Sequence, residues 1–164
     1  MLFLATIITA LVIGTTPPIV ELKGKDGGTV NGEPFSTKII KNKVFLVIYA
    51  DPDKKDLNED FTERIKKQNF DKTKFGSIAI INMKATWIPN FVLNGILKEK
   101  QKKYPNTIYV KDYNKIFVKK WNLKDDDFNV LLFDKDGKLL FYKAGKLTNK
   151  DTEKVIKLIK NHLE

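Results

Sequence analysis

The stretch VFLVIYADPDKKD, residues 44–56, decides the fold that this sequence predicts. Its first part, Val44–Tyr49, is an unbroken apolar run rich in β-branched and aromatic residues. Such runs are typical of strands that are covered on both faces, as in parallel sheets. The second part is polar and contains a proline, which indicates a loop. We therefore predict a central strand that ends in a polar loop.

Further strands and helices alternate downstream of this strand. The hydrophobic patterns predict helices over residues 56–70, 90–104, 113–121 and 147–163, and strands over residues 77–81, 107–110, 130–133 and 138–142. Asp56 and Thr148 are suited to cap the first and last of these helices, and we expect Phe91 to face the core. The residues Asp134-Lys-Asp-Gly137 predict a tight turn that joins the last two strands as a hairpin.

The order of these elements favours an α/β fold of the thioredoxin-like type. Alternating strands and helices imply right-handed crossovers onto a mostly parallel sheet, and the terminal hairpin adds antiparallel strands. We predict a central mixed sheet flanked by helices on both faces. Upstream, strands Ile19–Leu22 and Thr29–Val30 around a Gly-Gly turn predict an N-terminal β-hairpin. Residues 15–164 contain no repeat or linker, so we expect one domain.

The chain contains no cysteine. In thioredoxin-like proteins with redox activity, the turn after the first central strand carries a Cys-x-x-Cys pair, whereas here residues 50–56 carry none. Without a thiolate there is no nucleophile for disulfide exchange, so the sequence excludes thiol–disulfide oxidoreductase activity. The cis-proline that such proteins place before a later strand is also absent, because residues 125–129 read DDDFN. We expect trans peptide bonds there.

The N-terminal residues read as a signal peptide. Leu2–Ile13 is an apolar run that would span about 18 Å as a helix, well short of the bilayer core, and its length fits a signal-peptide core. Val12 and Gly14 are small enough for the −3 and −1 positions of a cleavage site. We predict that residues 1–14 are removed, that the mature chain starts at Thr15, and that it is periplasmic without a membrane span. An uncleaved anchor and a buried segment are the alternatives.

The chain is strongly basic, with a net charge of +10, and all but one of its 30 basic residues are lysines. Specific readers of nucleic acids depend on arginine for bidentate contacts to bases. Lysines dispersed over helices are more typical of solvated surfaces. We therefore expect no nucleic-acid partner, although a basic nucleic-acid-binding regulator remains an alternative.

Two loops of the predicted fold concentrate carboxylates. The loop after the central strand and the loop before the strand at residue 130 face each other in thioredoxin-like folds. We predict a binding groove at this edge, with Trp87 as the best candidate for an exposed binding aromatic; packing of Trp87 in the core under its loop is the alternative. The candidate groove residues are Asp51, Asp53, Asp56, Trp87, Asp126 and Phe128. Together with Asp125 and Asp127, the carboxylates could hold a hard cation through oxygen ligands, but roles as turn, cap and solvated residues are the simpler interpretation.

No motif in the chain identifies a catalytic site. His162, the single histidine, lies near the end of the last predicted helix, where a structural role is the simpler reading. The residues Asp134–Gly137 begin like a calcium loop but lack its later ligands. We therefore predict no catalytic residue, no metal site and no cofactor.

Residues 102–163 resemble the YtfJ family of small exported bacterial proteins. The resemblance rests on Lys103-Tyr-Pro105, Asp112, Trp121, Val130-Leu-Leu-Phe-Asp-Lys-Asp-Gly137, Gly145 and Leu147-Thr148, with looser likeness upstream to residue 17. It implies a periplasmic thioredoxin-like domain without the redox motif. The family is chiefly one of unknown function, so it supplies no catalytic residues, and the transcription-regulator label of some members conflicts with an export signal.

The sequence favours a non-enzymatic domain that binds a periplasmic protein or peptide. One alternative is a carboxylate- and cation-dependent enzyme, which would require a metal site and a carboxylate with a raised pKa in a cleft. The other is the nucleic-acid-binding regulator, which would be cytoplasmic and would bind DNA with a steep dependence on salt.

Overall fold

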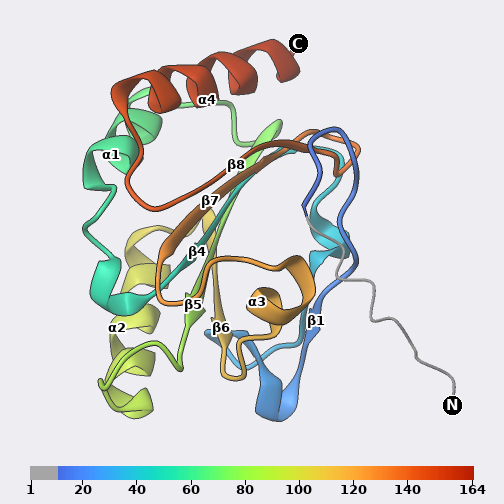
Figure 1. The fold of residues 1–164 in the computed structure, drawn as a ribbon. Helices are drawn as coiled ribbons and strands as arrows, with labels where there is room; N and C mark the ends of the chain where they lie inside the picture. Colours follow the sequence, from blue (N-terminus) through green and yellow to red (C-terminus); the bar gives the residue numbers. More distant parts are fainter. Residues whose placement is uncertain (1–10) are drawn as a thin grey trace, which may run out of the picture.

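A mixed six-stranded sheet with helices on both faces forms the body of the protein in the computed structural model (Figure 1). The structure describes residues 11–164, so most of the predicted signal peptide lies outside the described residues. The strands are β1 Glu21–Leu22, β2 Gly27–Thr29, β3 Phe35–Ser36, β4 Val44–Ala50, β5 Phe75–Asn82, β6 Thr107–Asp112, β7 Phe128–Phe133 and β8 Leu139–Ala144. The α-helices are α1 Glu59–Lys67, α2 Asn90–Lys103, α3 Ile116–Trp121 and α4 Asn149–His162.

The strand order of the sheet is β2-β6-β5-β4-β7-β8. The central strands β4, β5 and β6 are parallel, while β7 runs antiparallel to β4 and forms the terminal hairpin with β8. All but one of the residues of β4 are buried, as its continuous apolar run predicted. The predicted thioredoxin-like α/β fold with a central mixed sheet is confirmed.

Different elements pack against the two faces of the sheet. On one face, the even residues of β4, such as Leu46, pack with α1 and α4, and α2 covers the neighbouring strands β5 and β6. On the other face, the odd residues Val47 and Tyr49 pack with α3 and with the N-terminal segment around Val20. Figure 1 shows α1 and α2 on the side of the sheet opposite α3 and β1. Within residues 11–164, none of the helices has the length and apolarity that a membrane span requires.

The N-terminal strands pair differently from the prediction. A small two-stranded sheet is present, but β1 pairs with β3 and not with residues 29–30. Strand β2 instead lies antiparallel to β6 at the edge of the main sheet. Gly27 and Gly28 have φ values of 130° and 143°, and a Cβ at Gly27 would collide with the carbonyl of Lys111. Gly27 therefore allows close approach to β6 and Gly28 close approach to the backbone of Glu33, and the pair does not form the turn of a hairpin.

Tertiary contacts move two predicted helix starts. Helix α1 begins at Glu59 and not at Asp56: a short 3-10 turn forms over Pro52–Lys54, and the side chain of Asn58, which precedes the helix, hydrogen-bonds with Gly145 and Leu147. Helix α3 begins at Ile116 and not at residue 113. The start of α4 is as predicted, since Thr148 forms a reciprocal capping box with Asp151.

Candidate functional site

Three loops meet at the edge of the sheet where β4 and β5 end, and we call this edge the loop rim. It comprises residues 51–58 after β4, residues 83–89 after β5, and residues 124–127 before β7. Ala50 pairs with Phe128 at the end of the β4–β7 ladder, and the backbone N–H of Asp51 donates to the carbonyl of Asp127 at 3.0 Å. The predicted meeting of the two acidic loops is therefore present.

The loop that carries Trp87 is tied to the loop after β4. The hydroxyl of Thr86 donates to Oδ1 of Asp53 at 2.9 Å, and the N–H of Ile88 donates to the same hydroxyl at 3.2 Å. These bonds hold the backbone on both sides of Trp87. The indole itself is 100% exposed, so a solvent-facing aromatic ring stands on an anchored loop.

The predicted groove residues divide into exposed and buried groups. Asp53, Asp56 and Asp126 are exposed. Asp51 and Phe128 are only 5% and 3% exposed. The interpretation of Phe128 as a groove-lining aromatic is therefore wrong, because β7 starts at this residue and directs its ring into the core formed with α1 and α4.

Lys115 organises the carboxylates of the loop before β7. Its ammonium lies 2.7 Å from Asp125 and 3.4 Å from Asp126. Asp125 also accepts a hydrogen bond of 3.1 Å from the buried side chain of Asn82. Burial tends to raise the pKa of Asp125, but the bonds from Lys115, the Asp126 N–H and Asn82 outweigh it and lower that pKa. The hydrogen bond to Asp125 raises the pKa of Lys115 in turn.

The remaining rim carboxylates also have protein partners. Asp127 lies 3.6 Å from Lys124, and Asp56 pairs with Lys55. Oδ1 of Asp51 accepts the N–H of Asp53 at 2.8 Å, while burial raises the pKa of Asp51. Among residues 11–164, no three carboxylate or histidine side chains are grouped closely enough to hold a metal ion.

Asn129, the second residue of β7, holds the loop before that strand, where the sequence lacks the proline of redox-active thioredoxin-like proteins. Its amide donates to the carbonyl of Lys124 at 2.9 Å, and its Oδ1 accepts from the Lys124 N–H at 3.0 Å and the Tyr142 hydroxyl at 3.0 Å. The side chain of Asn129 is fully buried. Its hydrogen bonds to Lys124 hold the loop of residues 124–127 against the start of β7. The described residues contain no cis peptide bond, as predicted for residues 125–129.

Two features were not predicted from the sequence. They are the side chains that support the rim and the exposed apolar surface of α2. Asn82, Lys115 and Asn129 bind across the fold to residues that no local pattern identifies. Phe91 was predicted to face the core, but it is 78% exposed, and Leu93 and Leu97 are the residues of α2 that are buried. The sequence did contain a signal that one apolar side of α2 is exposed. Phe91 and Leu93 are two positions apart and cannot share one helix face, so both cannot be buried against the sheet.

The two remaining candidates have structural roles. Nδ1 of His162 lies 2.8 Å from the carbonyl of Leu158, one helical turn earlier. Oδ1 of Asp134 accepts the N–H groups of Asp136 and Lys138, each at 2.9 Å, and thus closes the β7–β8 turn. Both arrangements agree with the structural readings predicted from the sequence.

Comparison with known proteins places this geometry in context. The model of a family described as "Bacterial protein of unknown function (YtfJ_HI0045)" matches residues 21–162. An uncharacterized protein of Haemophilus influenzae is 31% identical over 144 residues, which cover 85% of this chain and 76% of the relative.

Among solved structures, the neighbours are thioredoxin-like. A candidate thiol:disulfide interchange protein, DsbE, from Chlorobium tepidum matches with a TM-score of 0.64 and 17% identity over 94% of this chain and 100% of its own. The exposed lipoprotein thioredoxin Etrx1 of Streptococcus pneumoniae matches with a TM-score of 0.60 and 14% identity over 88% and 99%. At these identities the likeness establishes the fold.

Proposed function

Because the chain belongs to the YtfJ family of bacterial proteins of unknown function, we propose its function from its own geometry: it is a periplasmic, non-redox thioredoxin-like domain that binds a protein or peptide partner at the loop rim. The absence of cysteine removes disulfide exchange. The rim, however, remains an ordered surface held by hydrogen bonds between its three loops.

Trp87 is the observation that supports partner binding most strongly. A tryptophan can bury on the order of 200 Å² of surface, and tryptophan is enriched among the residues that dominate binding energy. Its indole is fully exposed, while the Thr86–Asp53 bond holds its loop against the rim. An anchored loop loses less conformational entropy on binding than a free one. The exposed carboxylates Asp53, Asp56 and Asp126 would complement polar or basic groups of the partner.

A pull-down from periplasmic extract with the full chain as bait tests this function. We expect a partner that the wild type retains and Trp87→Ala loses. The matched control is Ile19→Ala, because Ile19 is also an exposed apolar residue but lies away from the rim. Thr86→Val keeps the indole and removes its tether, so we expect intermediate retention. Retention that is equal for all variants, or no partner with any bait, would contradict the proposal.

Cell fractionation tests the proposed location. We expect release of the protein by osmotic shock, with Thr15 as the new N-terminal residue. The exposed lipoprotein thioredoxin among the structural neighbours is consistent with a thioredoxin-like domain outside the cytoplasm. Recovery in the cytoplasm with Met1 intact would contradict the periplasmic proposal and favour the nucleic-acid alternative.

A further inference from the structure

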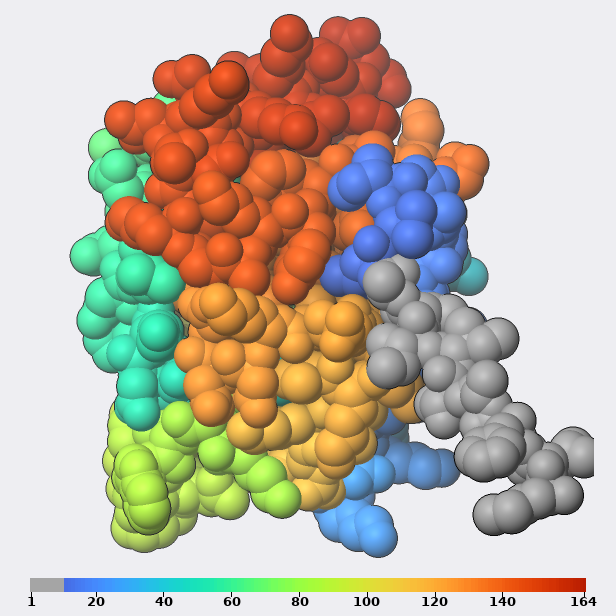
Figure 2. Space-filling view, viewed as in Figure 1, coloured from blue at the N-terminus to red at the C-terminus, as the bar shows by residue number. Residues whose placement is uncertain are grey.

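Helix α2 is apolar on its outer side as well as on its inner side. Leu93 and Leu97 are buried against the sheet, whereas Phe91 is 78% and Ile96 44% exposed. Trp87 precedes the helix, and four of the eight exposed large apolar side chains of the described residues lie between positions 87 and 96. In Figure 2 the yellow-green segment that includes the start of α2 forms the lower left corner of the molecule. This corner is a convex apolar tip.

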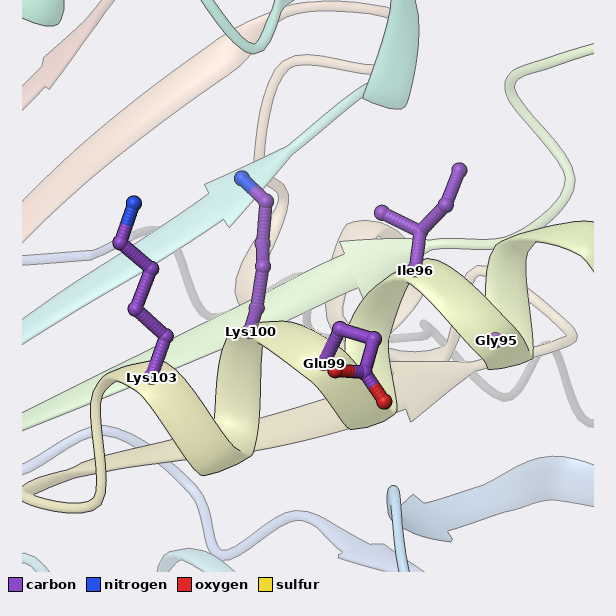
Figure 3. A pocket seen from close by; sticks show the side chains of 5 residues that line it. All are labelled: Gly95, Ile96, Glu99, Lys100 and Lys103. Carbon is purple, nitrogen blue, oxygen red and sulfur yellow. The ribbon is translucent and has the colours of Figure 1, made fainter.

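The second half of α2 is basic. Residues 98–103 contain four lysines and one glutamate. Glu99 pairs with Lys102 at 2.8 Å, while Lys98, Lys100 and Lys103 take part in none of the ion pairs of residues 11–164. Figure 3 shows Ile96, Lys100 and Lys103 projecting from one side of the helix, around a depression at Gly95. Along about 18 Å of helix the exposed positions thus change from apolar to cationic on both flanks, from Phe91 to Lys98 on one and from Ile96 to Lys103 on the other.

We propose that this surface, Trp87 with the outer side of α2, docks the domain on an anionic lipid membrane. Tryptophan is enriched at the interface between headgroups and acyl chains. Surface-bound helices combine inserted aromatic residues with flanking lysines, and each lysine near an anionic leaflet strengthens adsorption. The charge of the lysines is complementary to such lipids.

The shape of the surface favours a membrane over a peptide. An extended or helical peptide is recognised in a groove or at a free sheet edge, whereas the depression on α2 is lined by residues of that helix alone. The solvated side of α4 makes a useful contrast. It carries the exposed Lys150, Lys154 and Lys157, but none of the exposed large apolar side chains. Charge and exposed apolar surface coincide at α2.

Vesicle binding by the full chain tests this inference, which goes beyond partner binding and assigns Trp87 a second contact. The probes are vesicles of phosphatidylcholine and phosphatidylglycerol in equal parts, and vesicles of phosphatidylcholine alone. Trp121 is buried and Trp87 is exposed, so a blue shift of the emission and quenching by brominated lipid report insertion of Trp87. We expect both signals with the anionic vesicles only. Binding should weaken at about 1 M salt, where the Debye length is about 3 Å.

Matched variants locate the binding surface. Each lysine at an anionic surface contributes on the order of a fivefold gain in partitioning. We therefore expect the triple variant Lys98→Gln/Lys100→Gln/Lys103→Gln to partition about a hundredfold less. The control triple Lys150→Gln/Lys154→Gln/Lys157→Gln removes the same charge from α4 and should change partitioning by less than about threefold. Phe91→Ser/Ile96→Ser should lose the blue shift while circular dichroism shows an intact fold.

Three results would overturn the inference. Equal losses in the two lysine triples would indicate non-specific adsorption of a basic protein. An unshifted emission on bound vesicles would show that the apolar tip does not insert. Self-association that Phe91→Ser abolishes, without vesicle binding, would assign the tip to a contact between copies. In each case the pull-down with Trp87→Ala still decides partner binding separately.

Discussion

Asp112 is a fully buried carboxylate that joins the end of β6, the start of α3 and Tyr49 of β4. It accepts hydrogen bonds from the N–H groups of Asn114, Ile116 and Phe117 at 3.0 to 3.1 Å, and from the hydroxyl of Tyr49 at 3.2 Å. These bonds satisfy the first N–H groups of α3. Burial, and then the charge of Asp112, raises the pKa of Tyr49 strongly, so the phenol stays protonated and remains a donor.

Substitution of Asp112 should therefore destabilise the protein more than loss of its phenol partner. In Asp112→Asn the NH2 group that replaces one carboxylate oxygen cannot accept, so at least one N–H loses its acceptor, which costs about 2–3 kcal/mol. Tyr49→Phe removes a single hydrogen bond and should cost about 1 kcal/mol. Urea unfolding followed by the fluorescence of the buried Trp121 measures both. Equal stability of Asp112→Asn and the wild type would refute this role.

For individual residues, the sequence predicted which acidic loops meet but not which lysines pair with their carboxylates. The run Asp125–Asp127 was predicted to face the loop after β4, and it does, through the Asp127 carbonyl. Its carboxylates, however, bind Lys115 and Lys124. Which of many lysines pairs with a carboxylate depends on the path of the loop, and the left-handed backbone of Lys115 (φ 56°) has no sequence signature.

Helix α4 is an element whose start is set by local interactions. Thr148 accepts the N–H of Asp151, and the carboxylate of Asp151 accepts the N–H of Thr148 at 2.8 Å. The hydrogen bond from Lys143, followed by those from Thr148, lowers the pKa of Asp151 to about 2 from its ordinary value of 3.8. Since the pKa is lower in the folded state, ionised Asp151 stabilises the fold above about pH 4, and this contribution disappears as the pH falls toward 2.

The variant Asp151→Asn should reveal this pH dependence. At pH 7 we expect its free energy of unfolding to be lower than that of the wild type by about 1 kcal/mol, as for loss of a helix cap. The difference should shrink as the pH is lowered from 4 to 2, because the wild type loses the same charge. Urea titrations at several pH values measure it. A difference that is constant with pH would show that the carboxylate does not act through its charge.

Some elements were easier to predict from the sequence than others. The difference depends on whether the contacts that fix an element join residues close together or far apart in the chain. The Thr148 cap of α4 and the Asp134–Gly137 turn depend on residues within four positions of one another, and both were predicted. The start of α1 depends on the buried Asn58, whose side chain binds Gly145 and Leu147, 87 and 89 positions away. Helix α2 misled the prediction because its apolar residues occupy two sides.

For the whole molecule, the alternation of strands and helices restricted the topology enough to predict the sheet and its faces. Residues 11–30 could not be predicted in the same way. Their short strands carry little periodicity, and their positions depend on contacts with β6, α3 and β8. Leu139 of β8 donates to the carbonyl of Thr15 at 2.9 Å and accepts the N–H of Gly14 at 2.8 Å. The indole of Trp121 donates to the carbonyl of Pro18 at 2.7 Å.

These contacts predict how the domain tolerates shortening at its N-terminus. A chain that starts at Thr15, the proposed mature end, loses the Gly14 bond and the packing of Leu11. It keeps the bonds of Thr15 and Pro18, so we expect its free energy of unfolding to fall by about 1–2 kcal/mol. A chain that starts at Glu21 also loses the fully buried Val20 and the acceptor for Trp121.

The shorter chain should therefore be much less stable. Loss of a buried valine costs about 1.5–3 kcal/mol, and an unpaired buried indole N–H costs about 1–3 kcal/mol, so the Glu21 form should unfold about 3–5 kcal/mol more easily than the Thr15 form. Urea unfolding of the two chains measures this gap, and the emission of Trp121 should shift because its N–H has lost its acceptor. If the two chains unfold at the same urea concentration, residues 15–20 are not part of the folded domain. Their removal would then be compatible with cleavage further along the chain than Gly14.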